Sequence, residues 1–116
     1  MFYILPNMAT RALGELEFMV LWSVGQLGND AYGAEIRRDV GERLKRDYSV
    51  GAIYASLKRL EDKGLLTSHE SEPLPVRGGR SRRHFTMTSP GKTALRNGLA
   101  IRTRMLKSLN PSWRRA

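Results

Sequence analysis

The 116-residue chain has no cysteine and only two histidines. Without cysteine it can form neither a disulfide framework nor a thiolate metal site, and it suits a reducing compartment such as the cytoplasm. Nothing in the pattern places a nucleophile or a metal ligand beside His69 or His84. No nucleotide-binding glycine pattern occurs, because Gly78 and Gly79 lie in a basic segment and do not open a helix. We therefore expect a cytoplasmic protein that is not an enzyme and holds no metal or other cofactor.

Long hydrophobic runs are missing as well. The longest, MFYIL and FMVLW, fall far short of the roughly 20 residues that a membrane-spanning helix needs. The opening MFYILPNM has neither the basic segment nor the cleavage pattern of an export signal. A chain of this length with 41% hydrophobic residues fits one soluble domain with a modest core. Residues 1–12 are expected to form an N-terminal arm, either disordered or packed on the dimer.

Acidic residues are absent from the last third of the chain. All eleven lie before Arg77, whereas eleven of the twenty Lys and Arg residues lie at or beyond it, and the net charge is +9. A one-sided positive field attracts polyanions, which favours nucleic acid or an anionic membrane surface as the partner. The plainer interpretation is charge kept for solubility, with residues 111–116 as a basic tail.

Helical periodicity is strong in three early segments. Residues 13–27 predict a helix that is apolar on nearly all sides, so both of its flanks must be covered. The side away from its main stripe carries Phe18, Leu21 and Trp22. We expect a partner subunit to cover these side chains, with the N-terminal arm as the alternative. Residues 32–45 and 49–63 predict two further helices with a brief connection, which is a helix-turn-helix arrangement.

Two short strand-like runs follow, LLTSHE and RHFTMT, separated by a segment rich in Pro, Gly and Arg. They predict a two-stranded hairpin with a long tip. Ser89 as a cap and Pro90 after it predict a last helix over residues 89–109. The expected fold class is mainly α with a small β-hairpin. It comprises a winged helix-turn-helix domain over residues 13–88 and a C-terminal dimerisation helix over residues 89–110.

The last helix has one apolar stripe and one basic side, and it is too long and too apolar to stand alone. We expect it to pair with its mate and with the first helix of a second chain. A fold-back onto its own domain is the alternative. The residues expected in the dimer interface are Phe18, Leu21, Trp22, Leu95, Leu99, Ile101, Met105, Leu106 and Leu109.

The helix over residues 49–63 has an unusual outer face. Its inner stripe is apolar, yet the opposite side begins with Gly51, Ala52 and Ala55, which have almost no side chains. Such a face lets a helix lie close to base edges and phosphates in the major groove of DNA, although small residues also occur where two helices merely pack. The residues of this segment expected to meet DNA are Ser49, Gly51, Ala52, Tyr54, Ala55, Lys58 and Arg59.

The hairpin tip RGGRSRR adds a second cationic element. Arg77, Arg80, Arg82 and Arg83 surround two glycines and are expected to contact DNA. A flexible loop of this kind is suited to the phosphate backbone or to a narrow minor groove. The alternatives are a solvated loop and an RNA-binding tip.

The stretch SVGAIYASLKRLEDKGLL, followed by GGRSRRHFTMTSPGKTAL, resembles the PadR family of bacterial transcription regulators, in its compact branch with a single C-terminal helix. LGELEFMVLWSVGQLGNDAYGAEIRRDV is similar to the earlier part of the family pattern, and the resemblance covers about residues 13–109. It implies a winged-helix homodimer that binds a roughly palindromic operator in double-stranded DNA, represses a promoter and is often released by a small ligand. Ala55 and Ser81 depart from the pattern, since many members carry proline there.

A small hydrophobic effector is one further partner, in a site between subunits formed by Phe18, Trp22, Met105 and Leu106. Such a stripe is, however, more typical of an interface core. Two other classes stay open, namely a basic RNA-associated protein and a membrane-surface protein that uses the amphipathic last helix. We favour the DNA-binding regulator, which has no membrane partner.

Overall fold

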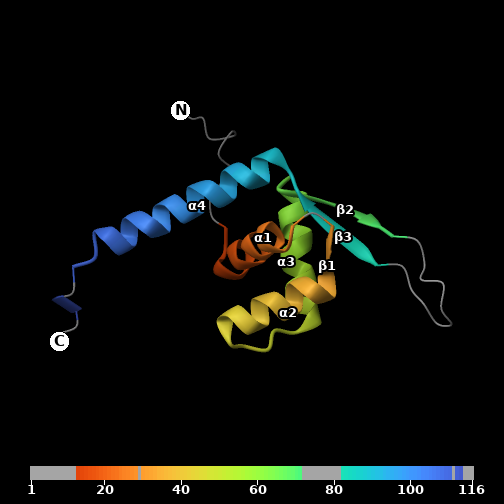
Figure 1. The fold of residues 1–116 in the computed structure, drawn as a ribbon, viewed down its shortest axis with the longest axis horizontal. Coiled ribbons are helices and arrows are strands. Elements are labelled where there is room, and N and C mark those ends of the chain that lie inside the picture. Colours follow the sequence, from red (N-terminus) through yellow and green to blue (C-terminus); the bar gives the residue numbers. More distant parts are fainter. Residues whose placement is uncertain (1–12, 29, 72–81, 111, 114–116) are drawn as a thin grey trace.

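The structure, a computed structural model, describes residues 13–28, 30–71, 82–110 and 112–113. The predicted N-terminal arm, Arg77, Arg80 and most of the basic tail lie outside the described residues. Within these ranges no helix is both long and apolar enough to cross a membrane. In chain order the elements are α1 (Glu15–Leu27), β1 (Ala31–Tyr32), α2 (Gly33–Leu44), α3 (Val50–Asp62), β2 (Leu66–Glu70), β3 (Arg83–Met87) and α4 (Ser89–Lys107) (Figure 1).

The helices begin and end where local chemistry favours it. Ser49 precedes α3, and its Oγ accepts a hydrogen bond from a first-turn backbone N–H at 3.0 Å. Gly64, with φ of +76°, follows α3 in the left-handed conformation that suits glycine. For α4 the predicted cap, Ser89, is wrong by one residue. The cap is Thr88, whose Oγ1 accepts from the Gly91 N–H at 3.0 Å, because the backbone is extended at Thr88 and helical from the next residue.

The sheet has three antiparallel strands in the order β1-β3-β2, one more than the predicted hairpin. Ala31 of β1 lies opposite Phe85 of β3, and Ser68 of β2 lies opposite the same residue on its other side. β1 has only two residues, too few for an alternating pattern to show in the sequence. It follows Asp30, whose φ of +67° turns the chain after α1. This strand ties the connection between α1 and α2 to the hairpin.

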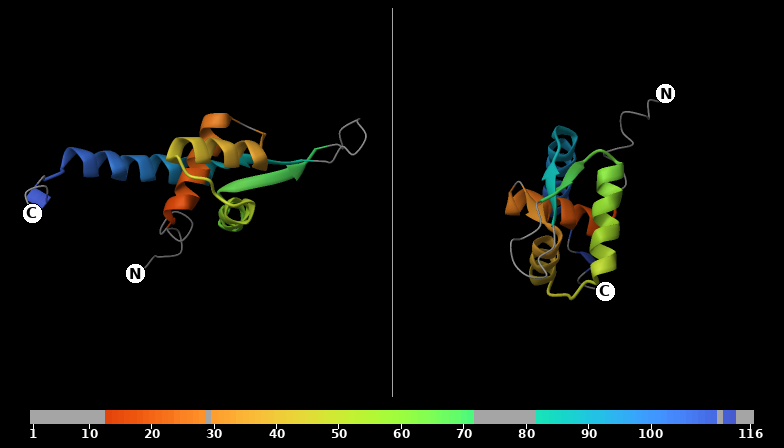
Figure 2. Two further views of the ribbon diagram at one scale, coloured as in Figure 1. Left: turned by 90° about the horizontal axis from the view of Figure 1, so that it is seen from below. Right: turned by 90° about the vertical axis from the view of Figure 1, so that its right-hand side faces the viewer.

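α1 lies at the centre of the domain, with α2, α3 and the start of α4 packed around it (Figures 1 and 2). Leu21 has no exposed surface and Phe18 is only 4% exposed, and both are covered by their own chain. The prediction that a partner subunit covers this side of the helix is therefore wrong for Leu21 and Phe18. Three neighbouring helices of the same chain supply the cover, which explains why α1 is apolar on nearly all sides.

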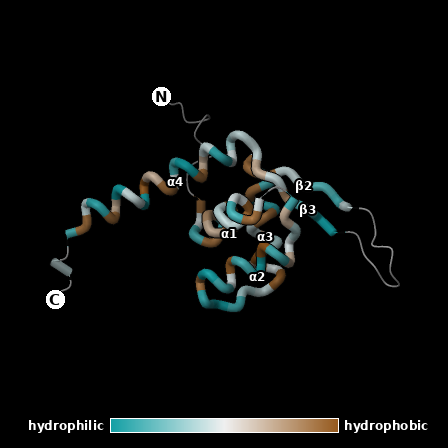
Figure 3. The backbone as a smooth tube through the Cα atoms, viewed as in Figure 1, coloured by the Kyte–Doolittle hydropathy of each residue, from teal (hydrophilic) through white to brown (hydrophobic). Residues whose placement is uncertain are grey.

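α4 has two halves with different surroundings. Gly91 and Ala94 are buried against the core, and a Cβ at Gly91 would lie 2.1 Å from the Leu65 carbonyl oxygen. The second half extends away from the body (Figure 2), and hydrophobic residues recur along it (Figure 3). The fold-back alternative therefore describes the first half only. Large apolar side chains are exposed on the second half at Leu99, Ile101, Met105 and Leu106, and Leu109 is exposed just beyond the helix, which ends at Lys107 and not at residue 109 as predicted.

Candidate nucleic-acid interface

The side of α3 that faces away from the core is nearly bare. Gly51 and Ala55 are exposed and Ala52 is half-buried. A Cβ built at Gly51 would have no other heavy atom within 4 Å, and the residue has no positive φ. The fold itself therefore does not require glycine at this position. The bare face leaves room for a molecule outside the domain, as the sequence pattern predicted.

Tyr54 joins α3 to the start of α2. Its side chain is partly exposed, and a Cβ at Gly33 would lie 2.0 Å from its hydroxyl oxygen. Only glycine fits beneath the ring at this point. The hydroxyl consequently lies beside the N-terminus of α2, where the helix dipole favours an anion. A phosphate contact by Tyr54 stays a prediction, and the ring position suits it.

A groove of about 550 Å³ runs between α2 and the start of α3, and we call it the α2–α3 groove. Val50 and Tyr54 form its α3 wall, and Gly33 begins its α2 wall. Three basic residues also line this groove, namely Arg37, Arg38 and Arg46.

Two of these arginines are held by the turn between α2 and α3. The Nε of Arg37 donates to the Tyr48 carbonyl oxygen at 2.7 Å, and its Nη2 donates to Asp47 at 3.3 Å. The guanidinium of Arg46 lies over the Tyr48 ring at 5.0 Å. Helical spacing alone cannot separate such residues from a solvated face, because the groove exists only once α3 packs across α2.

A second groove, of about 360 Å³, lies between α3 and the sheet, and we call it the α3–β3 groove. Lys58 and Glu61 line it from α3, and Arg83 lines it from β3. Arg83 donates to Glu70 Oε1 at 2.8 Å and to Ser68 Oγ at 2.9 Å, and the Ser68 hydroxyl donates to Glu61 at 2.8 Å. Arg83 is therefore held by its own hairpin and links that hairpin to α3.

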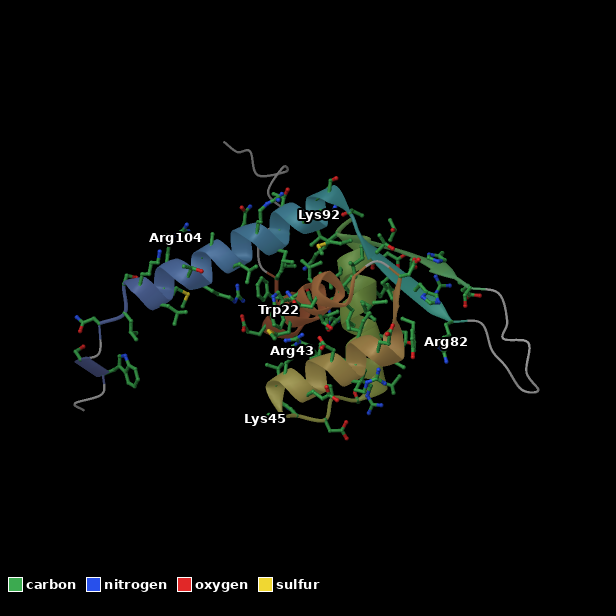
Figure 4. The ribbon with its side chains drawn as sticks, viewed as in Figure 1. Trp22, Arg43, Lys45, Arg82, Lys92 and Arg104 are labelled. Atoms are coloured by element: carbon green, nitrogen blue, oxygen red, sulfur yellow. The ribbon has the colours of Figure 1, made fainter. Side chains whose placement is uncertain are left out.

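Arg82 lies on the opposite face of the sheet from Arg83, as alternation along a strand requires. Its guanidinium stands 4.3 Å above the Tyr32 ring, near the end of β3 (Figure 4). On the same face the rings of His69 and His84 stack with centroids 5.5 Å apart. Arg82 and Arg83, the two described arginines of the predicted wing, therefore lie on different faces of the sheet.

Arg59 connects α3 to α1. Its Nε donates to Glu17 Oε2 at 2.8 Å, and Lys63 Nζ donates to Glu17 Oε1 at 2.7 Å. Burial raises the pKa of the Glu17 carboxyl, but the hydrogen bonds from Lys63 and Arg59 and the charges of both lower it by more, so this pKa lies below its ordinary value. The sequence alone does not indicate this role of Glu17, because its partners lie more than 40 residues away along the chain.

Arginines of the same chain cover two of the predicted interface rings. Arg102 lies 3.6 Å from the centre of the Phe18 ring, and Arg43 lies 4.5 Å from that of Trp22 (Figure 4). Leu95 packs partly buried against the core. Because Leu21 and Phe18 are buried by their own chain, the predicted dimer interface centres on the second half of α4.

An exposed second helix of a helix-turn-helix, flanked by basic grooves and followed by a hairpin, defines a winged helix-turn-helix protein. In the part of the chain that the structure describes, no group of three His, Cys, Asp or Glu side chains could hold a metal ion. The chain belongs to the PadR-like family of transcriptional regulators, whose family model matches residues 20–97. Its class of function is therefore transcription regulation through DNA, and it is not an enzyme.

Solved structures agree with this assignment. A PadR family transcription regulator from hypervirulent Clostridium difficile R20291 is 28% identical, with a TM-score of 0.65 over 84% of this chain and 100% of that one. RosR of H. salinarum is 25% identical, with a TM-score of 0.64 over 91% and 86%. The smu.1704 protein of Streptococcus mutans UA159 is 26% identical, with a TM-score of 0.62 over 92% and 87%. Among curated protein sequences, none matches the chain.

Proposed function

We propose that this regulator is a homodimer that binds a roughly palindromic operator in double-stranded DNA and represses the promoter that contains it. The observation that carries the proposal is the bare, exposed face of α3 at Gly51 and Ala55, which lies between two grooves with basic side chains. With α3 in the major groove, the phosphates on either side run along the α2–α3 groove and the α3–β3 groove.

The contacts divide into two kinds. Lys58 and Arg59 extend from the C-terminal part of α3 and read base edges. Contacts to phosphate come from the helix cap, the α2–α3 groove and the hairpin, and they position the duplex without reading it. The residues that we assign to phosphate are Ser49, Tyr54, Arg37, Arg38, Arg46, Arg82 and Arg83, together with Arg77 and Arg80 of the tip.

The free half of α4 supports the homodimer. Met105 and Leu106 are 63% and 75% exposed there, and Leu99 lies on the same apolar side of the helix. A helix with an uncovered apolar stripe of this kind gains stability by pairing with its mate, at about 25 cal/mol for each Å² buried. Such a pair holds the two α3 helices about one DNA turn apart, ~34 to 36 Å.

A small effector is not part of this proposal. Phe18 and Trp22 lie under arginine side chains of their own chain, and neither lines one of the two grooves described above. Release of the regulator from DNA by a small ligand is therefore supported only by the family resemblance.

Selection of bound sequences from a random duplex pool tests the proposal. We expect enriched sequences with two-fold symmetry, and we expect the same sequence as duplex RNA to compete poorly. Placing the enriched site in a reporter promoter should lower expression when the protein is present. Absence of enrichment, or equal competition by RNA, contradicts the proposal, and binding to anionic vesicles with the same affinity favours a membrane-surface protein.

A further inference from the structure

A single carboxylate of α1 holds two cations of α3. Glu17 lies in the first turn of α1, and its side chain is 10% exposed. Arg59 lies in the last turn of α3, and Lys63, four residues on, caps the C-terminus of that helix. Each donates to a different oxygen of this carboxylate, at 2.8 and 2.7 Å. Two fixed donors on one carboxylate leave that group with little freedom to turn.

The ion pair with Glu17 involves the Nε of Arg59 and not its two terminal amino groups. Its side chain is 54% exposed, and among the described residues only its Nε has a hydrogen-bond partner. The guanidinium is planar, so a fixed Nε also fixes the direction of the two terminal amino groups. Those two groups are the donors that bind O6 and N7 of guanine side by side.

The charge on Glu17 keeps this arrangement in place before any partner binds. Hydrogen bonds from Lys63 and Arg59 hold its pKa low despite burial, so the carboxylate stays ionised at neutral pH. A free arginine on a helix surface loses rotamer freedom when it is ordered by a partner, whereas Arg59 is already ordered. Binding of DNA by Arg59 is therefore not weakened by a further loss of rotamer freedom in its side chain.

We propose that Glu17 is a positioning residue, which aims the terminal amino groups of Arg59 at a guanine in the operator. The inference rests on the proposed function, in which α3 lies in the major groove. Lys63 is only 28% exposed and attaches α3 to α1 through the same carboxylate. It supplies a control that shares the structural role of the ion pair without the reading role.

The experiment compares binding to the operator selected from the random pool with binding to a scrambled duplex of the same composition. The variants are Glu17→Met, which keeps the volume but removes the acceptor, Glu17→Gln, which keeps one neutral acceptor, Arg59→Ala, and Glu17→Met combined with Arg59→Ala. We expect Glu17→Met to lower the operator-to-scrambled affinity ratio about tenfold and Glu17→Gln to lower it less. In the Arg59→Ala background Glu17→Met should change the ratio no further.

Lys63→Met is the control for a purely structural effect. It should lower the melting temperature as Glu17→Met does, while the affinity ratio stays at the wild-type value. An unchanged ratio for Glu17→Met, or the same loss with and without Arg59, overturns the inference. A wild-type chain that binds all duplexes alike overturns the proposed function as well, so the two failures are distinguishable.

A measurement on the wild-type chain guards against variants that do not fold. The Nε–H resonance of Arg59 in NMR reports its hydrogen bond to the carboxylate. We expect that resonance to keep its shifted position in the operator complex and only the terminal amino resonances to change. A return of the Nε–H resonance to the position of a solvated arginine on DNA binding overturns the inference.

Discussion

Gly51 and Gly98 lack a side chain for different physical reasons. At Gly98 of α4 a Cβ would lie 2.3 Å from Cε1 of Phe18, so the packing of α4 on α1 requires glycine. At Gly51 the same atom would meet open space. The fold thus requires glycine at position 98 but not at position 51, which the proposed complex places against the duplex.

Alanine substitutions at these two positions should change stability in opposite directions. Gly51→Ala should raise the free energy of unfolding by roughly 0.5 to 1 kcal/mol, since alanine favours a helix. Gly98→Ala should lower it by about 1 to 3 kcal/mol, because the methyl group collides with the Phe18 ring. Urea unfolding of both variants checks this. Two changes of the same sign would contradict the packing described for α4.

Filling the bare face should abolish DNA binding without unfolding the protein. In Gly51→Leu the new side chain occupies the space where base edges lie in the proposed complex. We expect operator affinity to fall roughly 100-fold, about 2.8 kcal/mol, with an unchanged helical circular dichroism spectrum. Mobility shift on the selected operator is the measurement. Wild-type affinity in this variant would show that Gly51 does not face the duplex.

At the scale of elements, α1 sets the positions of the helices that the proposed complex places against DNA. It packs against α2, α3 and the first half of α4, and Glu17 fixes α3 to it by hydrogen bonds. β1 fixes the hairpin to the start of α2 through pairing with β3. α3 and the hairpin are therefore both anchored to other elements of their own chain.

The link between α1 and α3 should weaken in acid. The pKa of Glu17 is lower in the folded chain than in the unfolded one. Its ion pairs therefore stabilise the fold fully at any pH above the ordinary pKa of a glutamate, about 4.3. This stabilisation is lost as the pH falls through the lowered pKa of the folded state. We expect Glu17→Gln to cost about 2 kcal/mol at pH 7. Urea unfolding at neutral and acidic pH should show the difference between wild type and variant shrinking in acid, and a difference that does not vary with pH would disprove the link.

At the scale of the whole molecule, the winged helix-turn-helix forms a compact body, from which the second half of α4 projects. The described residues extend 59 × 39 × 21 Å, and the longest dimension includes the free half of α4 (Figure 1). Lys92 and Arg104 lie at opposite ends of this helix, one near the body and one far from it (Figure 4). A projecting helix with exposed leucines and methionine on one side is typical of a surface that binds a second protein chain.

A charge on the apolar side of the second half of α4 should separate the subunits. Leu106→Asp places a carboxylate in the proposed dimer interface, where its desolvation is unfavourable. We expect the mass from light scattering at micromolar concentration to fall to that of one chain, 13.1 kDa, and affinity for the symmetric operator to fall with it. Ala100→Asp adds the same charge on the polar side of α4 and should leave both unchanged. A monomeric wild type, or equal behaviour of the two variants, would contradict the homodimer.

The sequence by itself determined the positions of the four helices and two of the strands, because caps, periodicity and turn residues act over a few neighbouring residues. It also determined that α3 has a bare face and that basic charge gathers late in the chain. Only the tertiary structure decided that Leu21 is covered by its own chain and that β1 joins the sheet. The pairing of Arg59 with Glu17 was likewise decided by the fold. Each of these depends on contacts between segments far apart in the sequence, and local spacing does not specify which distant segment will arrive.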